Sequence, residues 1–168
     1  DSDLQKKMEE IANGFSGGDK ANIAARDTLD GIAGDAVNDQ LLWPVSEAEW
    51  NGIDKSLRAF PADYWTRESW EGDVGFLDAP RYVYRVRKAL ADGRKLDGNA
   101  GVLVRPPEVT ETFAIRPALY VKAEALPKKV DGIQVAFGGQ WWYVVGQGEK
   151  GSVPGPENTV TLFENPRE

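Results

Sequence analysis

Cysteine and histidine are both missing from this chain of 168 residues. Without cysteine there is no disulfide framework, no thiolate zinc site, no iron–sulfur cluster and no cysteine nucleophile. Without histidine there is no Ser-His-Asp triad, no histidine metal site and no use of the commonest general base. We therefore expect a domain stabilised by its apolar core alone, which a chain of this length is able to bury.

Positive charge and long apolar runs are also scarce. Lys and Arg number 20 against 27 Asp and Glu, which gives a net charge of −7 at pH 7. Because such a surface repels phosphate backbones, we expect no nucleic-acid partner. No run of roughly 18 apolar residues is present, and the opening DSDLQKKMEE is unlike a signal peptide, so we expect no membrane insertion.

Two helical patterns open the chain. The apolar residues of 4–15 recur at helical spacing on one face, and Asn13-Gly14 is a natural end for that helix. A weaker apolar face predicts a second short helix across 19–30. The Gly-, Asp- and Asn-rich stretch 31–40 is predicted to be a loop.

The stretch LLWPVSEAEW is the sharpest local signal in the sequence. Residues 41–45 predict a short strand that contains Trp43 and ends at Ser46. Ser46 and Glu49 have the spacing of a capping box, and the helix that follows would turn Trp50 inward. We interpret the stretch as a strand that leads into a buried helix and assign its carboxylates no catalytic role.

After Pro61 the helical period disappears and strand patterns replace it. Runs rich in Val, Tyr, Trp and Phe alternate with Asp-Gly, Pro-Pro and Gly-Gly turn pairs. One alternative stays open, because RVRKALADG at 85–93 could also form a helix. Helices followed by strands predict an α+β fold with an antiparallel sheet. The predicted strands are 62–70, 81–87, 101–105, 113–121, 133–137, 140–146 and 158–163.

Four motifs in order resemble a known superfamily. LLWPVSEAEW is similar to the R-L-P-T-E-A-E-W segment of the formylglycine-generating-enzyme superfamily, which has a C-type-lectin-like fold. The rest of 15–121 resembles an uncharacterised bacterial domain of that architecture, with an F-x-x-x-E-K-x-x-I helix, a leucine-rich strand with S-x-x-E, W-x-R-S and G-V-R-P-A-L. The counterparts here are FSGGDKANI at 15–23, residues 41–50, YWTRES at 64–69 and FAIRPAL at 113–119. The resemblance implies a C-type-lectin-like α+β fold with a long loop excursion.

One motif of that family stands in a different place. The family opens with I-x-F-G-G-x-x-W-x-V-L-G, and the similar IQVAFGGQWWYVVG lies here at 133–146, after RPAL. The chain is then either circularly permuted, or it begins within one copy of a repeated domain and ends in the next. We expect the permuted arrangement, in which the hairpin 133–146 and the strand 158–163 complete the sheet.

These patterns predict a single domain over 1–168. We expect a helical part at 1–60, a sheet with a long loop excursion at 61–121, and a hairpin at 131–165 that completes the sheet. No low-complexity tract or Gly/Ser linker separates these parts.

The resemblance implies no catalytic or metal-binding residues in this chain. Formylglycine-generating enzymes use a cysteine pair and the related sulfoxide synthases a histidine-rich iron site, and this chain has neither residue type. The E-P-N or Q-P-D and W-N-D patterns of calcium-dependent lectins are also missing. We therefore predict no catalytic residue, no metal and no cofactor.

A ligand-binding surface is the remaining candidate. In lectin-like folds the excursion between the W-x-R-S strand and the RPAL strand faces the ligand, and here it is about 71–112. If strand side chains alternate across 81–87, its arginines point outward and Tyr82, Tyr84 and Val86 point into the core. Because side chains alternate along a strand, one of the adjacent Trp141 and Trp142 faces out. We take Trp142 as the candidate for the outward-facing, ligand-binding ring. The candidate ligand-binding residues are Trp70, Arg81, Arg85, Arg87 and Trp142.

Five other residues are assigned structural roles. Large aromatic rings at these motif positions are typical of core packing, and a buried arginine that bonds loop carbonyls would hold the excursion in place. The arginine row at 81–87 has a structural alternative to ligand binding, since it could be a solvated face or an internal set of ion pairs. The predicted structural residues are Trp43, Trp50, Trp65, Arg67 and Arg116.

We predict a non-enzymatic, adhesin-like recognition module, secreted or displayed on a bacterial surface. It would bind a protein or a glycan through the surface at 66–112, without an obligatory metal. An alternative is a structural subunit of a pilus or surface assembly that uses helix 3–13 and strand 158–163 as assembly surfaces. A hydrolase with a carboxylate pair is the less favoured third hypothesis.

Overall fold

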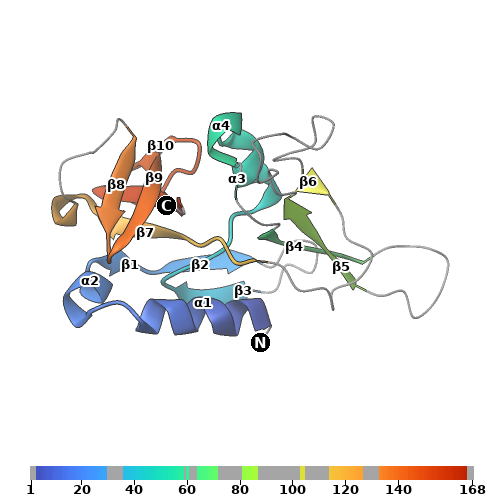
Figure 1. Cartoon of the computed structure of the whole chain (residues 1–168), viewed down its shortest axis with the longest axis horizontal. Helices are drawn as coiled ribbons and strands as arrows, with labels where there is room; N and C mark the ends of the chain where they lie inside the picture. The colour runs from blue at the N-terminus through green and yellow to red at the C-terminus, as the bar shows by residue number, and fades with distance from the viewer. Residues whose placement is uncertain are drawn as a thin grey trace.

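The computed structural model describes residues 3–29, 36–58, 60, 64–71, 81–86, 103–104, 114–126 and 133–165. Short helices come first and the main antiparallel sheet follows, so the predicted α+β class is confirmed (Figure 1). The helices are α1 (Asp3–Asn13), α2 (Gly17–Ala21), α3 (Glu47–Gly52), α4 (Lys55–Arg58) and the 3-10 turn η1 (Ala123–Ala125). The strands are β1 (Ile23–Ala24), β2 (Arg26–Leu29), β3 (Ala36–Gln40), β4 (Tyr64–Glu71), β5 (Arg81–Val86), β6 (Leu103–Val104), β7 (Ala118–Lys122), β8 (Gln134–Phe137), β9 (Gln140–Gln147), β10 (Lys150–Gly151) and β11 (Thr159–Glu164). Among the described helices, none is long and apolar enough to cross a membrane.

Six of these strands form the central sheet. Its order is β1-β7-β11-β9-β10, with β8 added beside β9, and every pairing in it is antiparallel. The hairpin predicted at 133–146 is present as β8 and β9, and the strand predicted at 158–163 is present as β11. Because β11 pairs with β7 along one side and with β9 along the other, the C-terminal segments do complete the sheet.

The turn between β8 and β9 consists of Gly138 and Gly139. Their φ angles are 62° and 76°, the left-handed values that a two-residue hairpin turn needs at both positions. A Cβ on Gly138 would overlap the ring of Phe15, two residues after the end of α1, so a side chain at this position would clash there. The Gly-Gly pair therefore shapes the hairpin and also leaves room for α1 to pack against it.

Two smaller sheets lie beside the central one. β2 pairs with β3, and β4, β5 and β6 form a three-stranded sheet. In Figure 1 this three-stranded sheet lies toward the opposite end of the molecule from α2 and β8. β5 is a strand through residue 86, so the alternative helix at 85–93 is wrong for its first two residues, and 87–93 lie outside the described residues.

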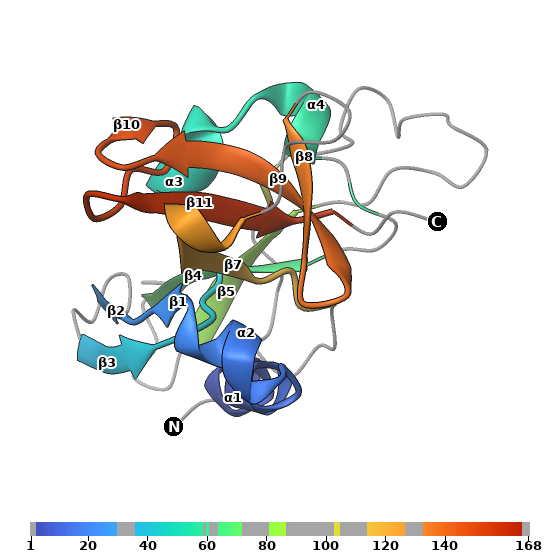
Figure 2. The ribbon, with the colours of Figure 1, turned by 90° about the vertical axis from the view of Figure 1, so that its left-hand side faces the viewer.

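The central sheet has an apolar core on each face. Figure 2 shows α1 and α2 on one side of the sheet and α3 and α4 on the other. The α1 side contains Met8, Ala12, Ile23, Leu42, Leu119, Val121, Val135, Phe137, Trp142 and Leu162, all buried. The α3 side contains Trp43, Val45, Trp50, Ile53, Tyr64, Ala118, Tyr120, Val145, Val153 and Phe163, also buried.

Helix α1 forms where its apolar period predicted. Met8 and Ala12 lie one turn apart and are buried against the sheet, while the intervening Glu9 and Glu10 are exposed. The helix ends at Asn13, and the N–H of Gly14 donates to the carbonyl groups of Glu10 and Ile11. The predicted stop at Asn13-Gly14 is confirmed.

The helix predicted across 19–30 is wrong after its first turn. Only α2 is helical here, with the Ser16 side chain accepting from the Asp19 N–H as its cap. The chain then becomes extended, because Ile23 pairs with Val121 at the edge of the central sheet and is buried there. Tertiary pairing thus outweighs a weak helical pattern.

The next two predictions also need correction. Residues 36–40 were expected in a loop, but they form β3 opposite β2, and 31–35 lie outside the described residues. The strand expected at 41–45 is reduced to a single bridge between Trp43 and Ala118. The chain passes from one face of the sheet to the other here, which leaves Leu42 in the core on the α1 side and Trp43 in the core on the α3 side.

The capping box of α3 is confirmed. The Ser46 Oγ accepts from the Glu49 N–H at 3.0 Å, and the Glu49 Oε1 accepts from the Ser46 N–H at 2.9 Å. The helix turns Trp50 inward with Ile53 just after it, and both are buried. A motif read from sequence spacing therefore sets the angle at which α3 meets the sheet.

Trp142 is a core residue, and its assignment to the ligand-binding set is wrong. It is 1% exposed, and its indole Nε1 donates to the carbonyl of Phe137 at 2.9 Å. The adjacent Trp141 is half-buried, as expected from the alternation of a strand. The core on the α1 side, with Met8 and Ala12 of α1, is what encloses Trp142.

We expect Trp142→Ala to lower the free energy of unfolding by about 3–5 kcal/mol, because it leaves a large cavity and removes the hydrogen bond to the Phe137 carbonyl. Trp141→Ala, the adjacent matched control, should cost clearly less because its side chain is only half-buried. Urea denaturation followed by circular dichroism measures both. Equal losses for the two variants would contradict the assignment of Trp142 to the core.

Candidate functional site

Most of the predicted ligand residues lie in one strand pair. Trp70 is in β4, while Arg81 and Arg85 are in β5, and the register places Trp70 opposite Tyr82 and Arg85 opposite Trp65. The backbone therefore places them on neighbouring strands, but the register position of Trp70 is that of Tyr82 and is out of phase with those of Arg81 and Arg85. Arg87 lies outside the described residues, and the alternation of side chains across 81–87 stays a prediction.

The predicted structural residues fall in two groups. Trp43 and Trp50 are buried in the core on the α3 side, at 0% and 3% exposure. Trp65 and Arg67 lie in β4, and the structure describes only their backbone. Arg116, just before β7, is the best defined of the five.

Arg116 is a buried cation that binds backbone carbonyls, with 1% of its surface exposed. Its Nε donates to the Glu164 carbonyl at 2.8 Å, Nη1 to the Arg58 carbonyl at 2.9 Å and Nη2 to the Leu57 carbonyl at 2.8 Å. Nη1 also donates to the Tyr64 hydroxyl at 3.2 Å. Only a guanidinium presents enough N–H groups at fixed angles to bind all four partners at once. This is the place and the bonding that the predicted structural role requires.

Aromatic rings surround the same cation. Its guanidinium carbon lies 3.8 Å from the centroid of the Phe163 ring and 5.0 Å from that of Phe60. Burial lowers the pKa of Arg116, but arginine starts so high that it stays protonated at physiological pH. Carbonyl dipoles and ring faces therefore offset the cost of burying its charge, and no described carboxylate forms an ion pair with it.

Tyr64 closes the base of the long excursion. It forms a parallel bridge with Ala114, so the chain leaves and rejoins the core at one place, at the two ends of residues 65–113. Its hydroxyl accepts from the Trp50 Nε1 at 3.1 Å and from Arg116. Burial raises the pKa of Tyr64, which keeps this hydroxyl neutral beside the cation.

A second arginine joins β2 to α3. The Nη1 of Arg26 donates to the Glu49 Oε2 at 2.8 Å, and its guanidinium carbon lies 4.1 Å from the centroid of the Trp43 ring. Glu49 also takes part in the capping box through its other oxygen. One carboxylate thus links the start of α3 to β2, so Glu49 has a structural role.

Glu164 is a carboxyl group partly withdrawn from water at the end of β11. Burial raises its pKa to about 7, and the nearby Arg116 charge lowers it less than burial raises it. Its Oε1 accepts from the Gln140 Nε2 at 3.2 Å, a neutral partner that stabilises a charge only weakly. Among the described residues no Lys or Arg forms an ion pair with it.

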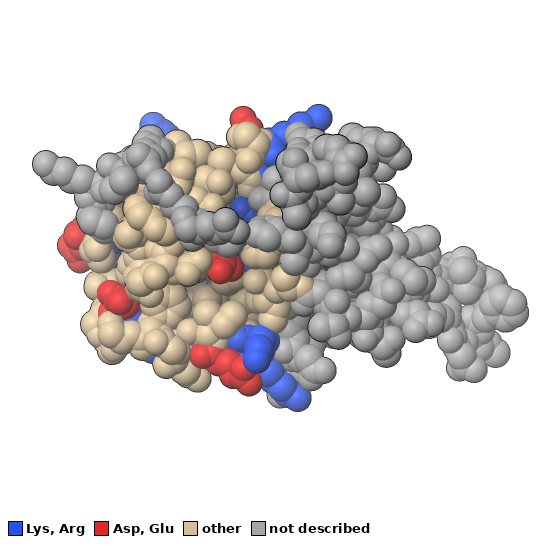
Figure 3. All heavy atoms as spheres, viewed as in Figure 1, with Lys and Arg blue, Asp and Glu red and all other residues tan. Residues whose placement is uncertain are grey.

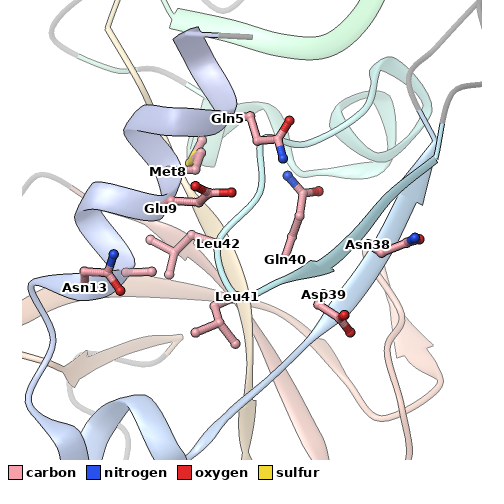
Figure 4. Close-up of a pocket in the computed structure, with 10 residues that line it drawn as sticks. Gln5, Met8, Glu9, Asn13, Asn38, Asp39, Gln40, Leu41 and Leu42 are labelled. Carbon is pink, nitrogen blue, oxygen red and sulfur yellow. The ribbon is translucent and has the colours of Figure 1, made fainter. Parts of the chain in front are cut away.

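The described surface contains a polar cavity of about 280 Å³ between α1 and β3. In Figure 4 the side chains of Gln5 and Glu9 from the helix and of Gln40 from the strand point toward one another across it. The sequence did not predict this site, because residues 36–40 of its strand wall were expected to form a loop. The lining residues are Gln5, Met8, Glu9, Ala12, Asn13, Asn38, Asp39, Gln40, Leu41 and Leu42.

The charged groups on the described surface are dispersed. Figure 3 shows acidic and basic side chains scattered over this face, without a large area of one sign among the coloured residues. Among the described residues, no three acidic side chains gather closely enough to hold a metal ion. The cavity between α1 and β3 is a concave feature of the described surface.

No family model, no curated protein and no solved structure matches the chain. The motif resemblance to lectin-like domains therefore stays an expectation, and function has to be argued from the residues themselves.

We expect Arg116→Lys to lower the free energy of unfolding by about 3 kcal/mol or more, because a single ammonium cannot bind carbonyls that lie in three directions. Lys150→Ala, a change at an exposed charged position, should leave stability within about 0.5 kcal/mol of wild type. Urea denaturation compares the three proteins. An unchanged midpoint for Arg116→Lys would show that the arginine does not hold these segments together.

Glu164 predicts a measurable pH dependence of stability. Its pKa is about 7 when folded and 4.5 ordinarily, so the folded state binds the proton more tightly. The contribution of the Glu164 carboxyl to the free energy of unfolding is fully present below pH 4.5 and is lost as the pH rises through 7. Glu164→Gln, which cannot ionise, should be more stable than wild type by up to about 3 kcal/mol above pH 7 and equal to it below pH 4.5. A constant difference between the two proteins across a denaturation series over that range would refute the assignment.

Proposed function

We propose that this chain is a non-enzymatic ligand-recognition module built on a C-type-lectin-like scaffold. Its ligand, a protein or a glycan, is held by the surface at 66–112 on β4, β5 and their connections. The observation that carries the proposal is the closed base of this excursion, where Tyr64, Ala114 and Arg116 meet. A long insert anchored at one point of a rigid core is the usual design of a recognition loop.

The core beneath that base is suited to such a role. The central sheet is packed on both faces, so residues 57, 58, 64 and 116 are fixed relative to each other. An insert that starts from a fixed base loses less entropy when it binds a ligand. The tryptophans and arginines of β4 and β5, including Trp70, Arg81 and Arg85, are residue types that dominate binding interfaces.

The proposal includes circular permutation of the lectin-like scaffold. The β8–β9 hairpin follows β7 in sequence, and β9 pairs with β11 in the sheet. A hairpin at the start of a lectin-like chain could pair with β11 at this same position. In a repeat array, residues 133–165 would belong to the next copy, and their strand β11 would have no need to pair with β7 of the first copy, as it does here. This pairing therefore supports permutation over a fragment of a repeat array.

The resemblance also motivates the proposed location, which is outside the bacterial cytoplasm in an adhesin-like role. The alternative of an assembly subunit loses one of its two surfaces, because β11 is paired along both sides and offers no free edge. Helix α1 still exposes its outer face, but no observation assigns that face a partner. For the hydrolase hypothesis, the cavity between α1 and β3 has two carboxylate residues in its lining, Glu9 and Asp39.

The test is a binding screen against a glycan array and surface proteins, run with calcium and with chelator. The wild type is compared with Arg85→Ala/Arg87→Ala, and we expect a specific hit that this double variant loses by about tenfold or more. Lys55→Ala/Lys150→Ala is the matched control, because it removes two exposed positive charges that lie outside the 66–112 surface. This variant should bind normally.

The possible results separate the hypotheses. A hit retained by Arg85→Ala/Arg87→Ala would move the binding surface away from β5. Equal losses in both double variants would show that only net charge matters. No hit at high concentration, together with self-association of the protein, would favour the assembly subunit.

A further inference from the structure

The strand β8 is an edge of the central sheet (Figure 1). It pairs with β9 along one side, and among the described residues no backbone group pairs with its other side. The Ile133 carbonyl accepts from the Val144 N–H at 2.8 Å, so the odd-numbered residues of this segment direct their backbone groups toward β9. Because these directions alternate along a strand, the N–H and carbonyl groups of Gln134 and Ala136 point away from the sheet.

This edge lacks the features that usually prevent the addition of another strand. The register of β8 with β9 runs without a bulge from Gln134 to Phe137, and the segment 133–137 contains no charged residue and no proline. The other edge strands of the central sheet, β1 and β10, are two residues long, and β10 contains Lys150. Within the described sheet, β8 is therefore the edge best suited to pair with an extended segment.

An apolar strip accompanies the outward backbone groups. Ile133 is 43% exposed, and it is the one large apolar side chain among the described residues that is exposed. Strand alternation places it on the face of β8 that carries Val135 and Phe137, both buried in the core on the α1 side. The half-buried Phe15 ring extends this strip, since its centroid lies 5.6 Å from that of Phe137.

We propose that β8 pairs with β8 of a second copy of this chain, antiparallel and across a two-fold axis at Val135. In this register Gln134 faces Ala136 of the second copy, and each such pair exchanges both of its N–H···O bonds, so every outward group of the two edges is used. Ile133 then lies opposite Phe137 of the second copy, and symmetry repeats the contact. The two central sheets become one continuous sheet.

The occupant is a second copy because the edge is complementary to itself. About its centre at Val135, the segment IQVAF places apolar opposite apolar residues on one face and the neutral Gln134 opposite Ala136 on the other. The chain has a net charge of −7, so two copies repel each other least where an uncharged segment meets an uncharged segment. Pairing across a two-fold axis consumes both edges, and association therefore stops at two copies.

The experiment is sedimentation velocity, supported by light scattering, from low micromolar to millimolar concentration. We expect a reversible change from the mass of one chain to that of two. Ala136→Pro removes an outward N–H that β9 does not use, so it should keep the fold by circular dichroism and weaken dimerisation about tenfold or more. Ala136→Ser keeps that N–H and is the matched control, which should associate as the wild type does.

A second variant keeps the test sharp if proline at 136 disturbs the fold. Ile133→Lys puts a charge opposite Phe137 of the second copy, but its position is exposed in a single copy. It should therefore weaken dimerisation and leave the urea midpoint unchanged at low concentration. A wild type that stays a single chain at millimolar concentration, an unchanged dimer in Ile133→Lys, or growth beyond two copies would each overturn the proposal.

The β8 edge shares no residue with the surface at 66–112 and does not depend on it. Ala136→Pro and Ile133→Lys leave that surface intact, so both variants should give the same hits as the wild type in the glycan and protein screen. Loss of dimerisation with retained ligand binding therefore separates this inference from the proposed recognition function. A pilus or surface assembly is distinguished as well, because its growth would continue past two copies.

Discussion

The hydrogen bonds of one buried cation connect the parts of this protein. Arg116 binds the carbonyls of residues 57 and 58 at the end of α4, the hydroxyl of Tyr64 at the start of β4 and the carbonyl of Glu164 at the end of β11. Without the guanidinium, the carbonyls of residues 57 and 164 would lose their side-chain donor, while the Arg58 carbonyl would keep the Tyr64 hydroxyl and that hydroxyl would keep Trp50. Leaving buried acceptors without a donor costs more than a typical single hydrogen bond contributes. Packing of α4 on the sheet and closure of the 65–113 excursion therefore depend on the same side chain.

That dependence has a consequence for function. The region proposed to meet the ligand leaves the core at Tyr64 and returns at Ala114, on the two sides of the Arg116 hydrogen bonds. Sequence changes within the excursion therefore need not disturb the core, because the anchor lies at its base and not within it. The β8 edge proposed to pair with a second copy is likewise fixed to the core, because Val135 and Phe137 are buried on the α1 side. Both proposed interaction surfaces are thus supported by the rigid, two-sided core.

Electrostatics in this protein is local. The net charge of −7 comes from residues spread along the chain, whereas Arg116 is held by ring faces and carbonyls, and Arg26 by the Glu49 carboxylate and the Trp43 ring. Glu164 shows the opposite case, a carboxyl whose raised pKa follows from partial burial beside a neutral amide. Neither environment could be inferred from composition, because each requires residues separated by more than 20 positions to meet.

Local sequence by itself determined α1 and its end at Asn13-Gly14, the capping box of α3, the Gly138-Gly139 turn and the α+β class. Each of these depends on neighbours a few residues apart, through helix period, caps or turn geometry. Tertiary structure decided the rest: Ile23 became an edge strand by pairing with Val121, residues 36–40 became β3 by pairing with β2, and Trp142 rather than Trp141 turned into the core. The cavity belongs to the same group, since its two walls come from α1 and from a bulged strand that local composition predicted as a loop. Strand pairing and the choice of the buried face depend on partners distant in the chain, and short-range patterns contain no information about which partner is chosen.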